Sequence, residues 1–491
     1  MKTEEIDCTP ETVQDETAPT GARLNWAEPK NLRELIVGGS TLVPTLDGTL
    51  RPYVNLDNAA STPIARPVKE KVDEFMEWYA AVHRGSGFKS QVATEAYEKA
   101  REIVAEFVGA DLSERTLIFV RNATEALNRC AARIPLDEGD VVLTTLMEHH
   151  SNLLTWRKRC VHVETISVDE FGAPLLDDLQ AHLDAHKGHV KLVAVSGGSN
   201  VTGVVPDIRR IARMVHEAGA MFLVDAAQLA PHRPINMGKL GDPECIDFLA
   251  MSAHKMYAPL GTGVLIGPYS AFTGGVPELV GGGTVLFVSE EAEIFNEPPD
   301  REEAGSPNVV GAIAMAAAAR FITEQLGWEW VVRHERELTS YAIERLNAIP
   351  GVTIYGPHDP SLPDDRLGVI CFNLEGVDHR LVSAILSHEY AIGTRTGCFC
   401  AHPYLLRLIG VSANRVHEIE EELSCGNRRA MPGAVRMSFG FYNSREDVDA
   451  IVSALWDIHN RKWRGEYRQN PKVGEYAPVE SKADPAGWFN L

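Results

Sequence analysis

The chain has 491 residues, of which 44% are hydrophobic and 23% are charged, so it is long enough for two or three domains with substantial cores. Its 47 basic and 68 acidic side chains give a formal net charge of −21, which argues against nucleic acid or an anionic membrane as a bulk partner. The acidic start of the chain lacks the apolar core of a signal peptide, and no apolar run approaches the length of a membrane span. We therefore expect a cytoplasmic protein whose eight cysteines are reduced.

Four segments of different character divide the chain. Residues 1–50 are rich in Thr, Glu, Pro and Gly and predict an extended arm that is partly disordered. Residues 51–330 alternate between apolar runs of strand length and helical patterns, which predicts a large α/β domain. Residues 331–462 predict a smaller α+β domain, and residues 463–491 form a polar tail that ends in aromatic side chains.

The large domain is expected to begin with a short strand and a turn at YVNLDNAASTP, followed by helices at 67–81 and 92–107. Beyond them, strands are expected at 117–120, 141–145, 161–168, 192–195, 222–224, 248–251 and 264–266, with helices that include 123–132 and 208–218. This alternation predicts a mainly parallel sheet covered by helices on both faces. Ligands bind such sheets beyond the carboxyl ends of the strands.

The remaining elements are a hairpin around 285–288, two long helices and a small mixed domain. The helices are expected at 306–325 and 329–348, and the alanine-rich part of the first predicts a packed core helix. The small domain should contain strands at 352–355, 368–373 and 434–440 and helices at 379–388 and 444–457. A further segment, 409–432, should lie near the mouth of the site.

A lysine stands between two apolar strands in the sequence IDFLAMSAHKMYAPLGTGVLIG. A buried ammonium is costly unless it is paired or used chemically, and desolvation lowers its pKa so that the amine can form a Schiff base with an aldehyde. The alternative is that Lys255 extends to the surface at the end of its strand. About thirty residues earlier, Asp225 ends the apolar run MFLVDAAQ, where it could hold a pyridine nitrogen protonated or cap a turn.

The Asp-x-x-Gln and Ser-x-His-Lys sequences together resemble the class V branch of the fold-type I enzymes that depend on pyridoxal 5′-phosphate (PLP), and within it the cysteine desulfurases and selenocysteine lyases. The resemblance spans about residues 53–455 and implies the fold-type I architecture, PLP as cofactor and a homodimer. It implies that Ala123, Thr124, Ser252 and His254 hold the cofactor phosphate, together with Ser306 of the neighbouring subunit. From the residues alone, Ser306 could instead be a helix N-cap.

The same resemblance assigns roles around the cofactor ring and the substrate. His149 would stack on the ring and transfer protons, while Asp225, Gln228 and Asn200 would contact the ring atoms. His150 is expected to be an ordinary structural histidine. Asn58 and Ala59, in the Asn-Ala-Ala segment, would lie near the substrate, as would Asn200.

The sequence IGTRTGCFCAHPYL separates this chain from other members of the class. Arg395 resembles the arginine that binds the substrate α-carboxylate, although it could also form a structural ion pair. Arg395, Gly397, Cys400, Ala401 and Pro403 fit the pattern of one group of desulfurases, so Cys400 is the candidate nucleophile. The Arg-Thr-Gly-Cys-Phe-Cys sequence is similar to that of molybdenum cofactor sulfurases.

Cys398 has three interpretations, as a second thiol that relays the persulfide, as a small apolar side chain, or as a metal ligand with Cys400 and His402. Two thiols and one histidine are too few for a closed site, so no metal is expected. The resemblance implies a PLP-dependent cysteine desulfurase, in which Lys255, His149 and Cys400 are catalytic and sulfur passes to an acceptor. The alternatives are a class V aminotransferase, epimerase or C–S lyase acting on another amino acid, and an inactive scaffold.

Overall fold

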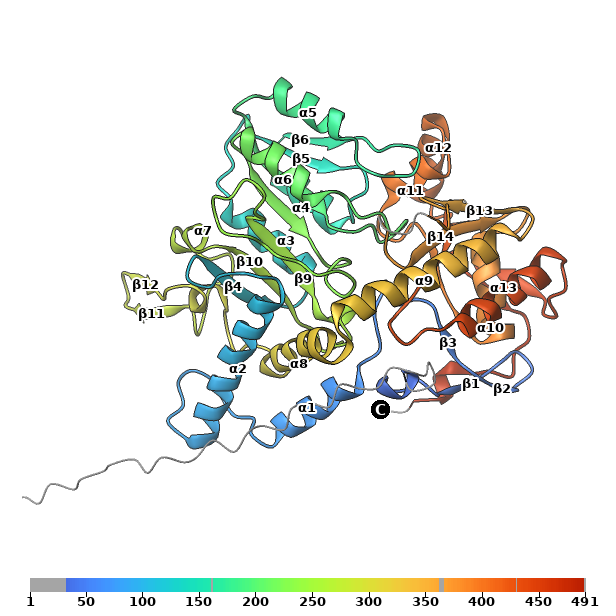
Figure 1. The fold of residues 1–491 in the computed structure, drawn as a ribbon, viewed down its shortest axis with the longest axis horizontal. Coiled ribbons are helices and arrows are strands. Elements are labelled where there is room, and N and C mark those ends of the chain that lie inside the picture. The colour runs from blue at the N-terminus through green and yellow to red at the C-terminus, as the bar shows by residue number, and fades with distance from the viewer. Residues whose placement is uncertain (1–31, 160–161, 362–365, 430, 490–491) are drawn as a thin grey trace, which may run out of the picture.

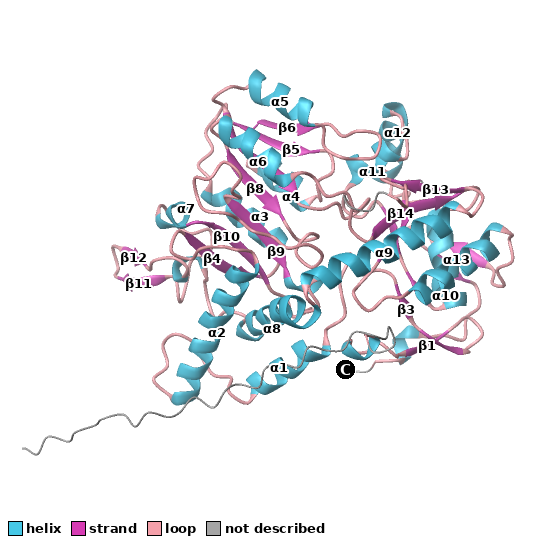
Figure 2. Ribbon diagram, viewed as in Figure 1, coloured by secondary structure: helices cyan, strands magenta, loops and turns pink. Residues whose placement is uncertain are grey.

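The computed structural model describes residues 32–159, 162–361, 366–429 and 431–489. Two sheets of different size, each covered by helices, make up most of the molecule (Figures 1 and 2). Most of the predicted N-terminal arm lies outside the described residues. Its last part forms the short strands β1 (Leu42–Pro44) and β2 (Leu50–Pro52), which pair with each other.

The larger sheet has seven strands in the order β4-β10-β9-β8-β7-β5-β6. Strands β5 to β9 run parallel, and β10 runs antiparallel between β9 and β4. The strands are β4 (Arg115–Val120), β5 (Val141–Thr145), β6 (His162–Ile166), β7 (Val190–Ser196), β8 (Met221–Asp225), β9 (Phe248–Ser252) and β10 (Gly263–Pro268). The predicted mainly parallel α/β fold is confirmed.

Both faces of this sheet are buried, because apolar side chains occupy consecutive positions in its strands. In β8, Phe222 and Val224 belong to the core on one face, and Leu223 belongs to the core on the other. The first core is covered by α1 (Arg66–Met76), α2 (Phe88–Phe107), α5 (Leu176–Ala185), α6 (Ile208–Glu217) and α8 (Val309–Arg320). The second is covered by α3 (Ala123–Arg133), α4 (Ser151–Lys158) and α7 (Tyr269–Thr273).

The helix that the sequence places at 306–325 begins at Val309 and continues through a π-helical turn, Phe321–Leu326. Its N-cap is Asn308, whose side chain accepts a hydrogen bond from the Gly311 amide, so the interpretation of Ser306 as the N-cap is wrong. By length and composition, Val309–Leu326 could cross a membrane, contrary to the expectation from the sequence. The segment is 67% buried within the protein, as the core helix of a folded domain would be.

The smaller sheet is antiparallel and has the strand order β13-β14-β17-β16. Its strands are β13 (Val352–Tyr355), β14 (Val369–Leu374), β16 (Arg395–Gly397) and β17 (Ala434–Ser438). Three helices pack with it around a separate core, namely α9 (Trp328–Asn347), α10 (His379–Tyr390) and α13 (Arg445–His459). Two further helices, α11 (His402–Leu408) and α12 (Ala413–Ser424), follow β16 in the chain.

A short segment near the start of the described chain connects the two parts. Strand β3 (Val54–Asn55) pairs in parallel with β15 (Ile392–Gly393), and Leu56 is buried in the core of the smaller part. Asp57 forms a parallel bridge with Ser438 at the end of β17. The chain then continues into α1, beside the larger sheet. Residues 54–57, expected in the large domain, therefore pack with the small one and bring both parts to the same cavity.

Candidate active site

A cavity of about 330 Å³ lies where the carboxyl ends of the large-sheet strands meet β16 and β17 of the small sheet. Strands β8 and β9 contribute their last residues, Asp225 and Ser252, and β7 contributes Ser196. The predicted site residues that line it are Ala59, Ala123, Thr124, His149, Asn200, Asp225, Gln228, Ser252, His254, Lys255, Arg395 and Cys400. The fold therefore brings together residues that are up to 341 positions apart in the sequence.

Lys255 follows β9 in a single 3₁₀ turn, Ala253–Lys255, and its side chain enters the cavity. Its ammonium donates a hydrogen bond of 2.9 Å to Oε1 of Gln228. Burial lowers the pKa of Lys255 to about 8, although the Asp225 carboxylate opposes this shift. The predicted alternative, a lysine that reaches the surface, is wrong. With a pKa of about 8, a fraction of the amine is neutral near physiological pH, and this neutral form can act as a nucleophile or a base.

Asp225 and Gln228 present unfilled hydrogen-bonding capacity to the cavity. One carboxylate oxygen of Asp225 accepts a 3.0 Å hydrogen bond from the Ala227 amide, and burial raises the pKa of this carboxyl. The Oε1 atom of Gln228 accepts from Lys255, which directs the amide nitrogen away from the lysine. This Nε2 atom is buried and has no hydrogen-bond partner among the described residues. Buried donors without an acceptor cost free energy, so this amide indicates a ligand with an acceptor atom.

The N-terminus of α3 forms another wall. Asn122 caps the helix by accepting from the Glu125 amide, and the Ala123 amide donates to the Ser252 hydroxyl at 2.8 Å. The Thr124 hydroxyl lies 2.7 Å from that of Ser151, at the start of α4. Two helix N-termini with hydroxyl side chains form a region that favours an anion such as a phosphate.

His149 lies just before α4, with its Nδ1 accepting from the Ser151 amide at 3.2 Å. Burial and the positive charge of Lys255 lower the pKa of His149 to about 4, so the ring is neutral at neutral pH. The preceding residue, Glu148, is buried and accepts hydrogen bonds from Thr145, Asn152 and Ser196. These bonds join the ends of β5 and β7. This network fixes the backbone from which His149 extends.

Arg395 is half-exposed and forms a 3.0 Å ion pair with Asp57. Sequence reasoning missed a second arginine, Arg436, which is buried and also lines the cavity. Its guanidinium donates to the Asn200 carbonyl at 2.9 Å and to the other oxygen of Asp57 at 3.1 Å. A charged residue inside the apolar strand AVRMS was the available signal, since arginine is seldom buried unless it is paired. Two adjacent guanidinium groups suit a carboxylate ligand.

The loop that carries Cys400 is strained and held from several sides. Phe399 and Cys400 have φ angles of 53° and 56°, in the left-handed region that costs about 1–2 kcal/mol for each non-glycine residue. Asn200 donates to the Phe399 carbonyl at 2.6 Å, and the His150 amide donates to the Cys400 carbonyl at 2.7 Å. These bonds keep the thiol exposed at the rim of the cavity.

His150 has a larger structural role than its sequence suggested. Its Nε2 accepts from the His402 amide at 3.1 Å, and the two rings stack with centroids 4.7 Å apart. His150 therefore binds both sides of the Cys400 loop. Cys398, in contrast, is buried outside the cavity lining, and its thiol donates to the Pro432 carbonyl at 3.1 Å. Burial raises the pKa of Cys398 to about 12, which favours its interpretation as a small buried side chain.

Two predicted site residues lie outside the cavity lining. Asn58 is buried, its amide donates to Asn55, Ser438 and Asn443, and its oxygen accepts from Tyr442. Its neighbour Ala59 is the residue that faces the cavity. Asn58 therefore supports the cavity wall through its backbone, and its side-chain hydrogen bonds go to protein groups.

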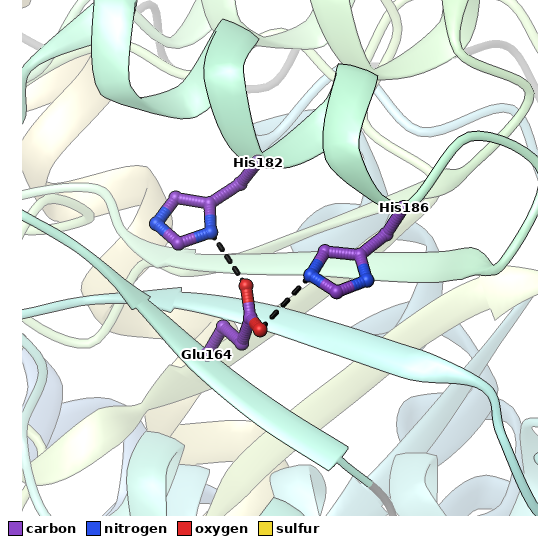
Figure 3. A group of neighbouring side chains, drawn as sticks. All are labelled: Glu164, His182 and His186. Carbon is purple, nitrogen blue, oxygen red and sulfur yellow. Dashed lines mark hydrogen bonds and ion pairs between the residues drawn. The ribbon is translucent and has the colours of Figure 1, made fainter.

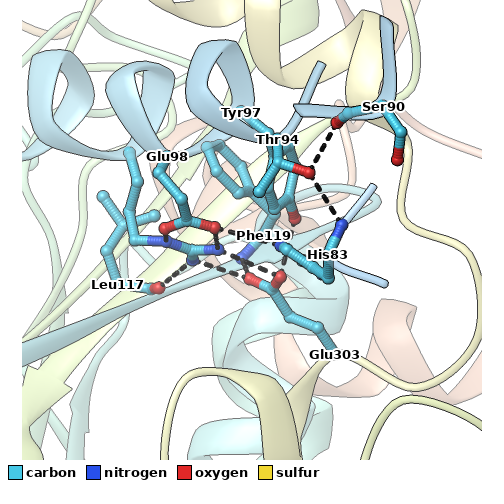
Figure 4. A network of polar contacts seen from close by, with 9 residues as sticks. His83, Ser90, Thr94, Tyr97, Glu98, Leu117, Phe119 and Glu303 are labelled. Carbon is cyan, nitrogen blue, oxygen red and sulfur yellow. Dashed lines mark hydrogen bonds and ion pairs between the residues drawn. The ribbon is translucent and has the colours of Figure 1, made fainter. Parts of the chain in front are cut away.

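The second predicted site residue outside the cavity lining is Ser306, which is exposed at the surface of this chain. The segment before it is anchored by Glu303, which is buried and accepts from Arg101, Tyr97 and the Phe119 amide (Figure 4). This network fixes the backbone that presents Ser306 outward.

The family match, the curated relatives and the solved structures that resemble this chain all indicate the same family. Residues 54–451 match the family described as Aminotransferase class-V. A probable cysteine desulfurase of Halalkalibacterium halodurans is 34% identical over 84% of this chain and 95% of that protein. A cysteine desulfurase of Haloferax volcanii is 35% identical over 85% of this chain and 92% of that protein. The apo structure of a cysteine desulfurase from Thermococcus onnurineus superposes with a TM-score of 0.75 at 33% identity, covering 88% of this chain and 98% of the other.

Proposed function

The chain belongs to the class-V aminotransferase family, and from that premise we propose that it is a PLP-dependent cysteine desulfurase that transfers the sulfur of L-cysteine to Cys400. The observation that carries this proposal is the presence of Lys255 and Cys400 in one cavity, the lysine half-buried and the thiol exposed. A lysine alone would serve many reactions of the family. The additional thiol supplies a nucleophile for sulfur.

The cavity residues fit PLP on the chemistry of their donors and acceptors. The unpartnered Nε2 of Gln228 would donate to the ring hydroxyl oxygen, and the Asp225 carboxylate would pair with a protonated ring nitrogen. Ala123, Thr124, Ser252 and His254 would surround the phosphate, and His149 would lie against the ring. Bound PLP supplies an aldehyde to which Lys255 can be linked and an electron-accepting ring that labilises bonds next to the substrate α-carbon.

The residues of this chain then have distinct tasks toward L-cysteine. Arg395 and Arg436 would hold the α-carboxylate, and the lowered pKa of Lys255 lets its amine remove the α-proton near neutral pH. The Cys400 thiolate would attack the substrate sulfur, so that an S–S bond forms as the C–S bond breaks and the β-carbon gains a proton, and Lys255 would return a proton to the α-carbon. Cys400 and L-cysteine thus become a Cys400 persulfide and L-alanine, without an external oxidant or reductant.

The persulfide sulfur would leave to an acceptor protein or, in its absence, to a thiol reductant as sulfide. The strained and exposed position of Cys400 at the rim supports this transfer, because a partner can reach the sulfur without entering the cavity. L-Cysteine is the favoured substrate, and L-selenocysteine would fit the same contacts.

The direct test is to incubate the purified protein with L-cysteine, PLP and a thiol reductant and to quantify sulfide, alanine and pyruvate. Equal amounts of sulfide and alanine are expected. Sulfide accompanied by pyruvate would instead identify a C–S lyase, and a 2-oxo acid without sulfide would identify an aminotransferase.

We also propose that the active form is a homodimer, with Ser306 directed to the cofactor phosphate of the other subunit. The hairpin β11 (Val285–Val288) and β12 (Glu293–Phe295) exposes 74% of Leu286, 56% of Phe287 and 59% of Val288. Ser306 follows Gly305, which lines a second cavity together with residues of this hairpin. Exposed apolar patches of this kind mark interaction surfaces, and a second copy of the chain would cover both features at once.

Light scattering coupled to size exclusion checks the oligomeric state. Wild type is expected as a dimer, and the double variant Leu286→Asp, Phe287→Asp as a monomer with reduced PLP retention. A variant that remains dimeric would contradict this assignment of the interface.

A further inference from the structure

A cluster of side chains of the kinds that bind metal ions lies away from the cavity, where α5 covers the edge strand β6. Glu164 extends from β6, and His182 and His186 extend from the end of α5 (Figure 3). One Glu164 oxygen lies 2.5 Å from Nδ1 of His182, and the other lies 2.9 Å from Nε2 of His186. The three donor atoms all lie within 4.8 Å of one another.

The periodicities of the two elements explain this convergence. His182 and His186 are four residues apart, so they occupy the same face of the helix, one turn above the other. Glu164 shares its side of β6 with Ile166, which is buried in the same core as Leu179 and Leu183 of α5. The helix therefore packs its apolar side chains on this face of the strand and holds the two imidazoles above the carboxylate.

Additional side chains complete the environment. His162, two positions before Glu164 and on the same face of β6, has its Nε2 3.3 Å from a Glu164 oxygen, beside the three-residue cluster. Asp178 lies 3.8 Å from Nε2 of His182, and its carboxylate is fixed by the Ser167 amide at 2.7 Å. A carboxylate behind the non-ligating nitrogen is the usual support of a metal-binding histidine.

We propose that Glu164, His182 and His186 bind a divalent transition-metal cation of the zinc type. Two imidazoles and one carboxylate are a common ligand set for zinc. Donors about 2.1 Å from a tetrahedral zinc are about 3.4 Å apart, so the contacts of Glu164 with His182 and His186 would lengthen by about 0.5–1 Å on zinc binding. The side chains of Glu164, His182 and His186 are 21%, 25% and 26% exposed, so they can move and a cation can enter.

The site stabilises the fold rather than the reaction. Strand β6 is the outer strand of the seven-stranded sheet, separated by β5 and β7 from β8, which carries Asp225. The cation would join the last turn of α5 to this edge strand. Bound zinc should therefore raise thermal stability without changing the turnover of L-cysteine.

The alternative is a set of ordinary hydrogen bonds and ion pairs to Glu164, and zinc titration of the PLP-loaded protein separates the two. After dialysis against a chelator, zinc is added in competition with a chromophoric chelator. Wild type and His189→Ala are compared with His182→Ala and His186→Ala. His189 is an exposed histidine in the same segment and outside the cluster, so it is the matched control.

Wild type and His189→Ala should bind one zinc ion that the other two variants lose, with affinity lowered about 100-fold or more. Saturating zinc should raise the Tm of wild type and of His189→Ala by about 2–5 °C and leave that of His186→Ala unchanged. Circular dichroism and the visible absorbance of bound PLP verify that each variant is folded. Equal zinc stoichiometry and equal Tm shifts in wild type and His186→Ala would overturn the proposal, as would the absence of zinc binding in wild type. Zinc bound at Cys400 would inhibit turnover of L-cysteine equally in all four proteins, because none of the substitutions alters Cys400.

Discussion

Arg395 and Arg436 lie directly opposite each other on the antiparallel strands β16 and β17, and each contacts a different oxygen of Asp57. The pair differs in environment, because Arg395 is 51% exposed at its side chain and Arg436 only 3%. Asp57 therefore keeps two cations together at the wall of the cavity. An incoming carboxylate can bind the exposed Arg395 and the buried Arg436 at once.

Replacement of either arginine should raise the KM for L-cysteine. Charge-assisted hydrogen bonds contribute about 1.5–3 kcal/mol, so Arg395→Ala should raise KM about 10- to 150-fold with a smaller effect on kcat. Arg436→Lys retains the buried charge but loses the directed hydrogen bonds to the Asn200 carbonyl and to Asp57, so it should raise KM by a similar factor. Steady-state kinetics with L-cysteine and with cysteamine, which lacks the carboxylate, provide the check. A KM for L-cysteine that is unchanged in both variants would remove the carboxylate-binding role.

Asp225→Asn should weaken PLP binding while preserving the shape of the side chain. Removal of one partner of a buried charge pair costs about 3–5 kcal/mol, so PLP affinity should fall at least 100-fold. Fluorescence titration of the apo protein with PLP measures this change. Asp247→Asn, which alters a carboxylate that binds His216 and the Phe222 amide outside the cavity, is the control. Equal affinity in Asp225→Asn and wild type would argue against the pairing with the ring nitrogen.

The capture of PLP by the apo protein should depend on the titration of Lys255. Because burial lowers its pKa to about 8, below the usual value of about 10.4, the neutral amine becomes available as pH rises through 8. The capture rate should therefore rise about tenfold per pH unit below pH 8 and level off above it. Stopped-flow absorbance measures the profile, and the reaction of PLP with Nα-acetyl-lysine, whose rate should still rise about tenfold between about pH 8 and 9, is followed separately as the reference for an ordinary lysine. A rate that still rises tenfold between pH 9 and 10 would show that Lys255 has an ordinary pKa.

The chemistry-bearing residues at strand ends were predictable because their position depends on local pattern. Lys255 and Asp225 follow apolar runs that could only be buried strands, and parallel topology places such ends at one edge. Arg436 and Glu148 were missed because each requires knowledge of its partners, Asp57 in one case and Ser196 in the other. Asn58 was misplaced for the same reason, since only the structure shows its amide saturated by protein groups.

The elements outside the two sheets were less predictable. Helix α12 was missed because its sequence is dominated by charged side chains and Ile419 is its buried residue, so it lacks an apolar stripe. The cluster at Glu164 needed the packing of α5 on β6, although the spacing of His182 and His186 was visible in the sequence. These features depend on contacts between residues far apart in the sequence, which local periodicity does not reveal.

The buried ion pair between Arg101 and Glu303 should contribute to stability. Both side chains are about 5% exposed, so Arg101→Met would leave Glu303 buried with fewer hydrogen bonds, at a cost of about 3–5 kcal/mol. The Tm should fall by several degrees. Lys69→Met, which removes an exposed pair with Asp73, should change it little. Equal Tm values for the two variants would contradict the importance of the network in Figure 4.

The formation of a persulfide on Cys400 tests the central claim most directly. PLP-loaded protein is mixed with a small excess of L-cysteine without reductant, alkylated and analysed by peptide mass spectrometry, with Cys400→Ser and Cys398→Ser in parallel. We predict one added sulfur atom on the Cys400 peptide of wild type and of Cys398→Ser, matched by one equivalent of alanine. Cys400→Ser should form no persulfide and almost no alanine while it retains the visible absorbance of bound PLP. Alanine or sulfide production by Cys400→Ser at the wild-type rate would contradict the account.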